Sequence, residues 1–418
     1  MRTHYLLLTM AVVAVSCSVS SQSGDDVDPS VEPDERHEIM LTKAEETIVK
    51  GNNTFAFGLL RSVADAKESS EHVFVSPLSA ALAFGMLSNG AAGDTFDEIR
   101  RTFGFADISN EDINNYYLKI ITELKAVDRA VALESANSIW INQRFTALDA
   151  FVKVNEEKYD AEVRNEDFSN PATLDLINAW CAEKTHGKID RILNELSDDA
   201  VMCLLNALYF KGMWSEPFEK ALTTDNTPFY NQDGSRTPVS MMHRELKAMY
   251  TGGEDFEMLE LPYGNGAFSM MLLLPGEGST VTSIAENLDA TVWEDRMARM
   301  RKCEVELSFP RMSLEYEIEL NEALKAMGMP SMFDEMKADF SRINPNAKFV
   351  VSKVIQKTTL DINEEGTEAA AVTAIVMIEM SAPGPPEHVS MTFDRPFLLF
   401  IKENSTGVIM FAGLTKKL

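Results

Sequence analysis

The spacing of apolar residues along the chain changes from a helical period in the first half to a strand period in the second. Ser109 with Asp112 forms a helix-start signal, and the amphipathic stripe that follows consists of Ile113, Tyr116, Ile120 and Leu124. Residues 304–309 alternate between polar and apolar side chains, which predicts a strand with one buried face. Further buried strands are predicted at 268–274, 349–355, 397–401 and 408–412. Helices first and strands later, without regular β-α-β alternation, predict an α+β fold with a mostly antiparallel sheet.

One segment near the C-terminus has the composition of a loop and the side-chain pattern of a strand. Residues 358–363 are typical of a strand, and an Ala- and Thr-rich stretch at 367–377 precedes a proline-rich turn at 382–386. A strand that inserts between two existing strands needs small uncharged side chains on its buried face and no Pro. Residues 367–377 satisfy both conditions, so we interpret them as a loop that can become a strand. An Ala-rich helix or a plain surface loop is the alternative.

The composition is that of a globular protein with an acidic surface. Of 418 residues, 45% are hydrophobic and 25% are charged, which is enough apolar material for a large core. Asp and Glu number 65 against 38 Lys and Arg, a net charge of -27. Because nucleic-acid binding requires clustered Lys and Arg, this balance argues against a nucleic-acid partner.

The first 16 residues have the pattern of an export signal peptide. Arg2 supplies the positive start, and the apolar run that follows is too short to remain as a spanning helix. Residues 13–17 resemble a bacterial lipoprotein box that ends in Cys17, whereas Ala14–Ser16 also fits ordinary signal peptidase. We favour a lipid anchor on Cys17, the expected contact with the membrane, because a cysteine there has no other evident use; free secretion is the alternative. Both interpretations predict an extracellular or outer-surface protein.

The rest of the chain divides into a linker and one folded domain. Residues 17–37 are acidic, rich in Ser and Pro, and poor in large apolar side chains, which predicts a flexible linker. Residues 38–418 show no break in composition and no internal repeat, so we expect a single domain. Besides Cys17 there are Cys181, Cys203 and Cys303, which lack metal-ligand spacing and are interpreted as buried hydrophobic residues.

The usual enzyme signatures are missing from the sequence. There is no nucleophile elbow, no phosphate-binding P-loop and no zinc-protease helix motif, and the six histidines are scattered. A catalytic triad assembled from distant residues stays an open alternative. Residues 276–278, Gly-Glu-Gly, follow a buried strand and are interpreted as a turn. We therefore predict a protein that is not an enzyme, with no cofactor and no metal.

Several short motifs, in order from about residue 47 to the C-terminus, resemble those of the serpin family. They lie at 74–79, 89–95, 177–180, 185–189, 206–214, 217–218, 261–263, 309–311, 338–341, 394–397 and 407–413. The resemblance implies a single domain with a large central, mostly antiparallel β-sheet, surrounding helices and an exposed reactive-centre loop at about 364–386.

The resemblance also implies a mechanism and a class of partner. In inhibitory serpins a protease attacks the loop and forms an acyl-enzyme, and the loop then inserts into the sheet and distorts the catalytic site before deacylation. The driving force is a native fold that is only kinetically stable. The implied partners are serine proteases in covalent 1:1 complexes, with some cysteine proteases as further targets and a monomer as the free state. Some family members inhibit nothing.

The hinge of the loop resembles the inhibitory pattern. It comprises Glu364, Glu365, Gly366, Thr367, Glu368, Ala369, Ala370 and Ala371. In the family the scissile bond lies about seventeen residues after the hinge glutamate, which places the reactive bond at Met380–Ser381. Cleavage at Met377 or Ile378 is the alternative. An unbranched apolar Met implies elastase-like, chymotrypsin-like or subtilisin-like targets rather than trypsin-like ones.

Below the sheet the family has a polar cluster that controls opening. Ser76, Ser79 and Asn206 match its positions, and Gln356 stands where the family usually has His. Glutamine both donates and accepts, so we expect the hydrogen bonds without a His-linked pH dependence. Trp214 matches the tryptophan at the top of the sheet, where the loop enters. No dense group of Lys and Arg suggests a heparin-type cofactor.

Two hypotheses for function follow. The favoured one is a suicide inhibitor of serine proteases with apolar specificity. The alternative is a non-inhibitory serpin that acts as a binding or chaperone-like protein. The two differ in whether a covalent complex with a protease forms.

Overall fold

The computed structural model describes residues 36–66, 72–367 and 387–418. Its helices are α1 Lys43–Ala66, α2 Pro77–Ser88, α3 Gly93–Thr102, α4 Asn110–Ala126, α5 Asp149–Tyr159, α6 Ala172–Lys184, α7 Val281–Asn287, α8 Ala290–Arg299 and α9 Asn321–Ala326, with short 3-10 helices η1 Lys220–Leu222 and η2 Ser331–Phe333. The predicted signal peptide, Cys17 and most of the reactive-centre loop lie outside the described residues.

The strands form two sheets. Their bounds are β1 His72–Val75, β2 Val131–Asn142, β3 Glu162–Glu166, β4 Met202–Met213, β5 Thr224–Tyr230, β6 Arg236–Thr251, β7 Phe256–Tyr263, β8 Phe268–Pro275, β9 Arg301–Pro310, β10 Met312–Glu319, β11 Val351–Asn363, β12 Gly366–Thr367, β13 His388–Thr392, β14 Phe397–Glu403 and β15 Ile409–Thr415. A six-stranded sheet has the order β10-β11-β12-β4-β2-β3. A nine-stranded sheet runs β1-β15-β14-β8-β7-β6-β9-β13, with β5 on β6.

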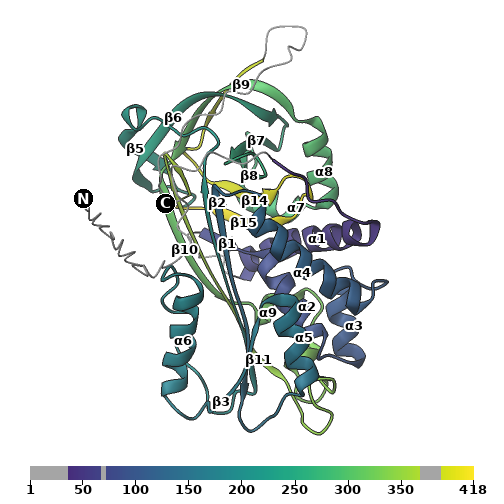
Figure 1. Cartoon of the computed structure of the whole chain (residues 1–418). Coiled ribbons are helices and arrows are strands. Elements are labelled where there is room, and N and C mark those ends of the chain that lie inside the picture. Colours follow the sequence, from purple (N-terminus) through teal and green to yellow (C-terminus); the bar gives the residue numbers. More distant parts are fainter. Residues whose placement is uncertain (1–35, 67–71, 368–386) are drawn as a thin grey trace, which may run out of the picture.

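Most strand pairs are antiparallel, as the sequence predicted. The parallel pairs among the described strands are β2–β3, β9–β13 and β4–β11. In Figure 1 the strands of the six-stranded sheet lie with α1–α5 on one side of them and α6 on the other. The fold is therefore α+β, and β4–β11 is the parallel pair that lies next to the hinge strand β12.

Local sequence explains the predicted helix and strand. Ser109 caps α4 by accepting a hydrogen bond from the Asp112 backbone N–H at 3.1 Å, and the predicted stripe is buried. In β9 the side chains of Val305, Leu307 and Phe309 are buried, and the residues before and between them, Glu304, Glu306 and Ser308, are not. Strands β8, β14 and β15 match three further predictions, and the turn predicted at 276–278 follows β8.

Two details differ from the sequence prediction. Segments 349–355 and 358–363 are not separate strands, because β11 runs continuously from Val351 to Asn363. Two polar residues, Gln356 and Lys357, interrupt the apolar run of β11, and both are buried with partners. Gln356 hydrogen-bonds to Ser76 beneath the sheet, and the Lys357 ammonium lies 2.6 Å from the Glu315 carboxylate. The first half of the chain also contains β1–β4, which the helical pattern concealed. Strand β4 is almost entirely buried, so it lacks the alternation that marks a half-exposed strand.

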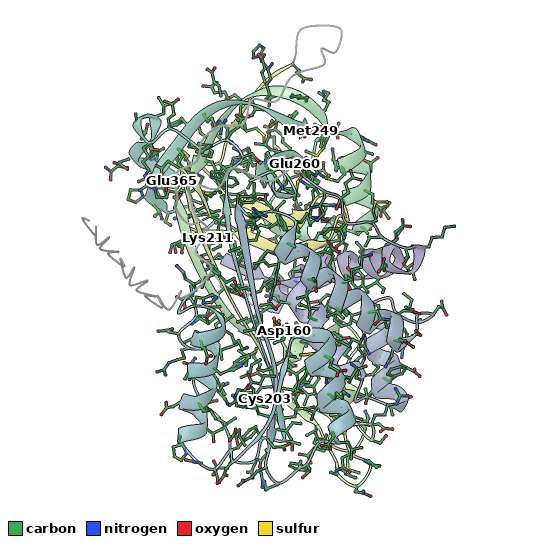
Figure 2. The ribbon with its side chains drawn as sticks, in the orientation of Figure 1. Asp160, Cys203, Lys211, Met249, Glu260 and Glu365 are labelled. Carbon is green, nitrogen blue, oxygen red and sulfur yellow. The ribbon has the colours of Figure 1, made fainter. Side chains whose placement is uncertain are left out.

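The core is divided by the six-stranded sheet. A large apolar cluster lies between the two sheets and the helices α1–α5, and a smaller one lies between α6 and the sheet. Cys181, Cys203 and Cys303 are buried and free, as predicted, and burial raises the pKa of the Cys181 and Cys203 thiols to about 12. Figure 2 shows Cys203 near one end of the sheet and Glu365 near the other. Within the described residues, no helix has the length and apolar character needed to cross a membrane.

Candidate loop hinge and sheet-opening cluster

The hinge already occupies a place in the six-stranded sheet. Strand β12 lies between β11 and β4, with Thr367 paired antiparallel to Ile362 on one side and to Gly212 on the other. Further along the sheet β4 and β11 pair directly and in parallel, up to Thr359 opposite Tyr209. Among the described residues, the two strands therefore separate only at the end that holds β12.

Gly366 makes this entry sterically possible. Its φ is +148°, a region that side chains rarely allow. A Cβ atom here would lie 2.2 Å from the Gly212 carbonyl oxygen. The glycine recognised in the hinge pattern is therefore required by backbone conformation and by the close approach of β4.

Thr367 begins the buried side of the entering strand. It is 1% exposed, and its Oγ1 lies 2.9 Å from the Tyr263 hydroxyl. Tyr263 in turn stacks on Trp214, with ring centroids 4.5 Å apart. A small, uncharged side chain fits this position, and a charged one would be buried without a partner.

An ion pair between the buried Glu364 carboxylate and the half-exposed Arg311 side chain holds the start of the hinge. The Glu364 carboxylate, 2% exposed, accepts hydrogen bonds from Arg311 Nη2 at 2.5 Å and from Thr223 Oγ1 at 2.7 Å. Burial raises the pKa of this carboxyl, but the two hydrogen bonds and the Arg311 charge outweigh burial and leave the pKa below its ordinary value. Glu365 pairs with Lys220 at 2.5 Å in a more exposed position.

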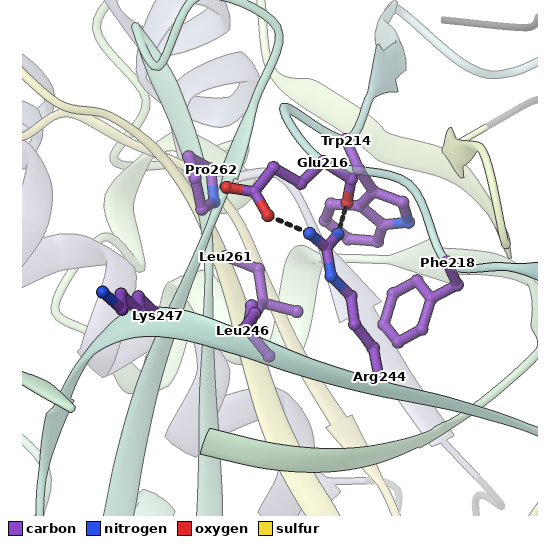
Figure 3. Close-up of a pocket in the computed structure, with 8 residues that line it drawn as sticks. All are labelled: Trp214, Glu216, Phe218, Arg244, Leu246, Lys247, Leu261 and Pro262. Atoms are coloured by element: carbon purple, nitrogen blue, oxygen red, sulfur yellow. Dashed lines mark hydrogen bonds and ion pairs between the residues drawn. The ribbon is translucent and has the colours of Figure 1, made fainter. Parts of the chain in front are cut away.

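Trp214 hydrogen-bonds to the hinge and to the residue before it through both its side chain and its backbone. Its indole N–H donates to the Asn363 carbonyl at 3.0 Å, and its backbone N–H donates to the Glu365 carbonyl at 2.9 Å. The Phe218 backbone N–H donates to the Glu364 carbonyl at 2.7 Å. The segment after β4, of which Trp214, Glu216 and Phe218 are drawn in Figure 3, thus holds the chain just before the point where it enters the sheet.

The residues of the predicted polar cluster lie together beneath the sheet, midway along the paired strands β4 and β11. Ser76 N–H donates to Gln356 Oε1 at 2.8 Å, and Gln356 Nε2 donates to the Ser76 carbonyl at 2.9 Å and to Asn206 Oδ1 at 3.2 Å. Ser79 Oγ also donates to Asn206 Oδ1, and Asn206 Nδ2 donates to the Ser79 carbonyl at 3.1 Å. Gln356 therefore both accepts and donates hydrogen bonds at the position where the family usually has His.

This cluster joins β4 and β11, the two strands on either side of β12. Gln356 of β11 and Asn206 of β4 are direct partners in the sheet; Asn206 bonds to Ser79 in the first turn of α2, and Gln356 bonds to Ser76, its N-cap. All four side chains are almost completely buried. The contacts that hold β4 against β11 are therefore also contacts with the helix beneath them.

Sequence reasoning missed several partners of these residues. Asn137 of β2 accepts a hydrogen bond from Asn206 Nδ2 and extends the cluster to a third strand. Arg311 lies in a motif that the sequence analysis quoted, but its role as the Glu364 partner had no local signal. Thr223 and Lys220 lie in an unremarkable polar segment. Long-range pairs of this kind are formed by the fold and leave no periodic pattern.

Part of the predicted site lies outside the described residues. This applies to hinge positions Glu368, Ala369, Ala370 and Ala371, to Met377 and Ile378, to the bond Met380–Ser381 and to Cys17. Among residues 36–66, 72–367 and 387–418, no group of three or more His, Cys, Asp or Glu side chains is arranged to hold a metal ion.

Comparison with known sequences identifies relatives over almost the whole chain. The family model described as Serpin (serine protease inhibitor) matches residues 50–417. Iripin-2 of Ixodes ricinus is 33% identical over 381 residues, which cover 90% of this chain and 94% of that protein. Intracellular coagulation inhibitor 1 of Tachypleus tridentatus is 33% identical over 380 residues, 89% of each chain. Serpin B6 of Pongo abelii is 33% identical over 377 residues, 88% of this chain and 98% of that one.

Solved structures give the same result. The thermophilic serpin Tengpin in its native state has a TM-score of 0.80 and 29% identity, covering 93% of this chain and 98% of that chain. Human thyroxine-binding globulin in complex with its hormone has a TM-score of 0.81 and 27% identity, covering 90% and 100%. With the hinge, the polar cluster and the two-sheet topology in place, the chain belongs to the serpin family.

Proposed function

We propose that this protein is a suicide inhibitor of serine proteases that traps the acyl-enzyme by inserting its reactive-centre loop between β4 and β11. The observation that carries the proposal is β12: Gly366 and Thr367 already pair with both neighbouring strands, and Thr367 presents a small uncharged side chain to the interior. The remaining inserted positions, from Glu368 to Ala371, follow without Pro. The protein itself performs no catalysis in this scheme.

The trapped species is an ester. The protease serine Oγ attacks the Met380 carbonyl carbon, and the Met380–Ser381 peptide bond breaks as the Ser381 nitrogen takes a proton and leaves as an amine. Insertion then carries the ester-linked protease with the loop. The catalytic site is distorted, so water does not complete deacylation and a covalent 1:1 complex remains.

The sequence around the bond supports an apolar specificity. Met380 would fill a hydrophobic primary pocket, and no Lys or Arg lies between Gly366 and His388. Elastase-like, chymotrypsin-like and subtilisin-like proteases are therefore the proposed targets, and trypsin-like proteases are not. We also propose action at the cell exterior, with Cys17 as lipid anchor. The mass of the mature N-terminal peptide, which begins at Cys17 in both interpretations, would separate a lipidated Cys17 from an unmodified one.

The test is to mix the purified protein with elastase, chymotrypsin, subtilisin and trypsin and to analyse the products on denaturing gels. The expected result is a band of summed mass with at least one of the first three and a released peptide that begins at Ser381. A released peptide that begins after Met377 or Ile378 would show that the protease cuts there and not at Met380–Ser381. Cleavage by every protease without a summed band would overturn the proposal.

The second candidate is a non-inhibitory serpin that binds another molecule. Thyroxine-binding globulin, a structural relative, is a serpin in complex with a hormone, so binding without a protease partner occurs on this fold. The uncharged hinge at Thr367 favours the inhibitor instead. A cleaved chain that forms no covalent complex would support the binding protein.

A further inference from the structure

A group of asparagine and tyrosine side chains lies in the core where the helices α1, α2, α4 and α5 pack together. Its members are Asn52 of α1, Asn89 at the C-cap of α2, Asn114, Tyr116 and Tyr117 of α4, and Asn155 and Tyr159 of α5. All are buried except Asn89, which is half-buried. The three tyrosine rings belong to the large apolar cluster, so the polar atoms of this group lie in surroundings of low polarity.

One end of the group is a set of direct hydrogen bonds among three helices. Asn89 Nδ2 donates to Asn114 Oδ1 at 3.1 Å and to Asn155 Oδ1 at 3.2 Å, and Asn114 Nδ2 donates back to Asn89 Oδ1 at 3.1 Å. The Tyr159 hydroxyl donates to Asn114 Oδ1 at 2.6 Å. At this end the side chains supply one another's partners, apart from Asn155 Nδ2, which has none among the described residues.

The other end of the group contains two polar groups that lack a partner. The Tyr117 hydroxyl donates to Asn52 Oδ1 at 3.2 Å, but within the described part of the chain neither Asn52 Nδ2 nor the Tyr116 hydroxyl is hydrogen-bonded. Turning the Asn52 amide over would only exchange which of its two ends is left unpaired. A buried polar group without a partner bears its full desolvation cost, and such groups are rare in folded proteins. A hydrogen-bonding partner is therefore expected at this end.

The two unpaired groups lie near each other and are both neutral. The Tyr117 side chain, which bonds to Asn52, has its ring centroid 5.1 Å from that of Tyr116. Burial, together with the charges of Glu45 and Glu403, raises the pKa of the Tyr116 hydroxyl, so it remains an O–H group. Asn52 lowers this pKa against that trend, as a close polar neighbour does, although the two side chains share no direct hydrogen bond. Polar groups that are close but not directly bonded are commonly bridged by a water molecule.

We propose that an ordered water molecule bridges the Asn52 amide and the Tyr116 hydroxyl and thereby joins α1 to α4 inside the core. Two polar partners are the fewest that hold a buried water, and the amide N–H and the hydroxyl supply them. An anion is disfavoured here by the charges of Glu45 and Glu403, and a cation is disfavoured by the amide N–H. As a part of the core, this water is independent of the proposed function.

The direct test is a crystal structure of the purified protein at a resolution that shows ordered water. The expected result is a water peak within hydrogen-bonding distance, about 2.7–3.2 Å, of both Asn52 Nδ2 and the Tyr116 hydroxyl oxygen. Density without a peak at this position would overturn the proposal. A direct hydrogen bond between the Asn52 amide and the Tyr116 hydroxyl would overturn it as well.

Thermal unfolding of Tyr116→Phe gives a second test, because this change removes the hydroxyl alone. Loss of a bond to water should lower the transition temperature by about 1–3 °C. A hydroxyl buried without any partner would be a cost to the fold, so an unchanged or raised transition temperature would overturn the proposal. Tyr117→Phe removes the direct bond to Asn52 and is the positive control, and Tyr230→Phe, at an exposed ring, should change the transition little.

Discussion

At the scale of single residues, the hinge depends on a charge that the fold has buried. The Glu364 carboxylate is 2% exposed and is held by Arg311 and Thr223, whereas the neighbouring pair of Glu365 with Lys220 is exposed on the lysine side. A buried carboxylate that loses a partner bears its desolvation cost, while an exposed pair contributes little. Loss of the Glu364 partner is therefore expected to lower the free energy of unfolding more than loss of the Glu365 partner.

We expect Arg311→Ala to lower the free energy of unfolding by about 1–3 kcal/mol, because it removes a charge-assisted hydrogen bond to a buried carboxylate. Since its partners lower the pKa of Glu364, the stabilisation is present above the ordinary value of 4.5 and is lost as the pH falls through the lowered pKa. Denaturant unfolding at pH 7 and across pH 3–6 measures both effects. The matched control is Lys220→Ala, which should change stability little. Equal losses for the two variants would contradict this assignment.

Gln356→His tests the absence of a pH switch in the sheet-opening cluster. Gln356 accepts from the Ser76 N–H, so a histidine there must keep one ring nitrogen unprotonated to replace it. Burial disfavours the charged imidazole, so the variant should lose stability, relative to the parent, as the pH falls below about 6.5. The measurement is the difference in thermal transition between variant and parent from pH 8 to pH 5. If the difference in transition temperature stays constant with pH, the cluster does not need a hydrogen-bond acceptor for the Ser76 N–H.

At the scale of elements, β12 is the part of the hinge that already pairs as a strand. It contains only Gly366 and Thr367, yet it has partners on both sides. The next positions of the chain must follow Thr367 between β4 and β11 if insertion proceeds. The earliest inserted side chains therefore decide whether the element can grow.

Thr367→Arg should convert the inhibitor into a substrate. The arginine would have to be buried where Thr367 meets Tyr263, without a counter-charge among the contacts of the threonine. We expect cleavage by the target protease with little or no covalent complex on denaturing gels. Thr367→Val keeps the size and the lack of charge and should retain the complex. Unimpaired trapping by the arginine variant would show that β12 is not the start of insertion.

At the scale of elements, the sequence pattern identified some helices and strands correctly and missed or divided others. The cap and stripe of α4 and the alternation of β9 identified those elements, because each is amphipathic and each period is local. Strand β4 was concealed because both of its faces are buried, and β11 was divided because Gln356 and Lys357 interrupt its apolar run. The partners that make those two polar residues acceptable, Ser76 and Glu315, come from distant segments.

At the scale of the whole molecule, the strand order of the six-stranded sheet bears on the proposed insertion. Strands β4 and β11 pair directly in parallel over most of their length, while the two residues of β12 pair antiparallel with both. Parallel pairing is slightly weaker per residue than antiparallel pairing. Growth of β12 would replace one parallel interface with two antiparallel ones, so the uninserted fold is a state from which the chain can still release free energy.

Cleavage within the loop should therefore raise the thermal stability of the protein. We expect the chain cut near Met380 to unfold at a temperature well above that of the intact chain, because the freed segment can complete the sheet. Differential scanning calorimetry before and after limited proteolysis measures the change. The Thr367→Arg variant, cut at the same bond, is the control and should gain much less. An intact and a cleaved parent with the same transition would rule out stored free energy in this sheet.

The sequence alone was sufficient for the family, the α+β class and the hinge motif, because these depend on short motifs, local periods and side-chain sizes that can be read in order. It was also sufficient to anticipate that Gln356 could replace a histidine, since hydrogen-bonding capacity belongs to the residue type. Only the tertiary structure decided which groups meet: Arg311 with Glu364, and Asn137 with Asn206. These contacts join positions far apart in the chain, and their energies depend on burial, which exists only once the two sheets and their helices have packed together.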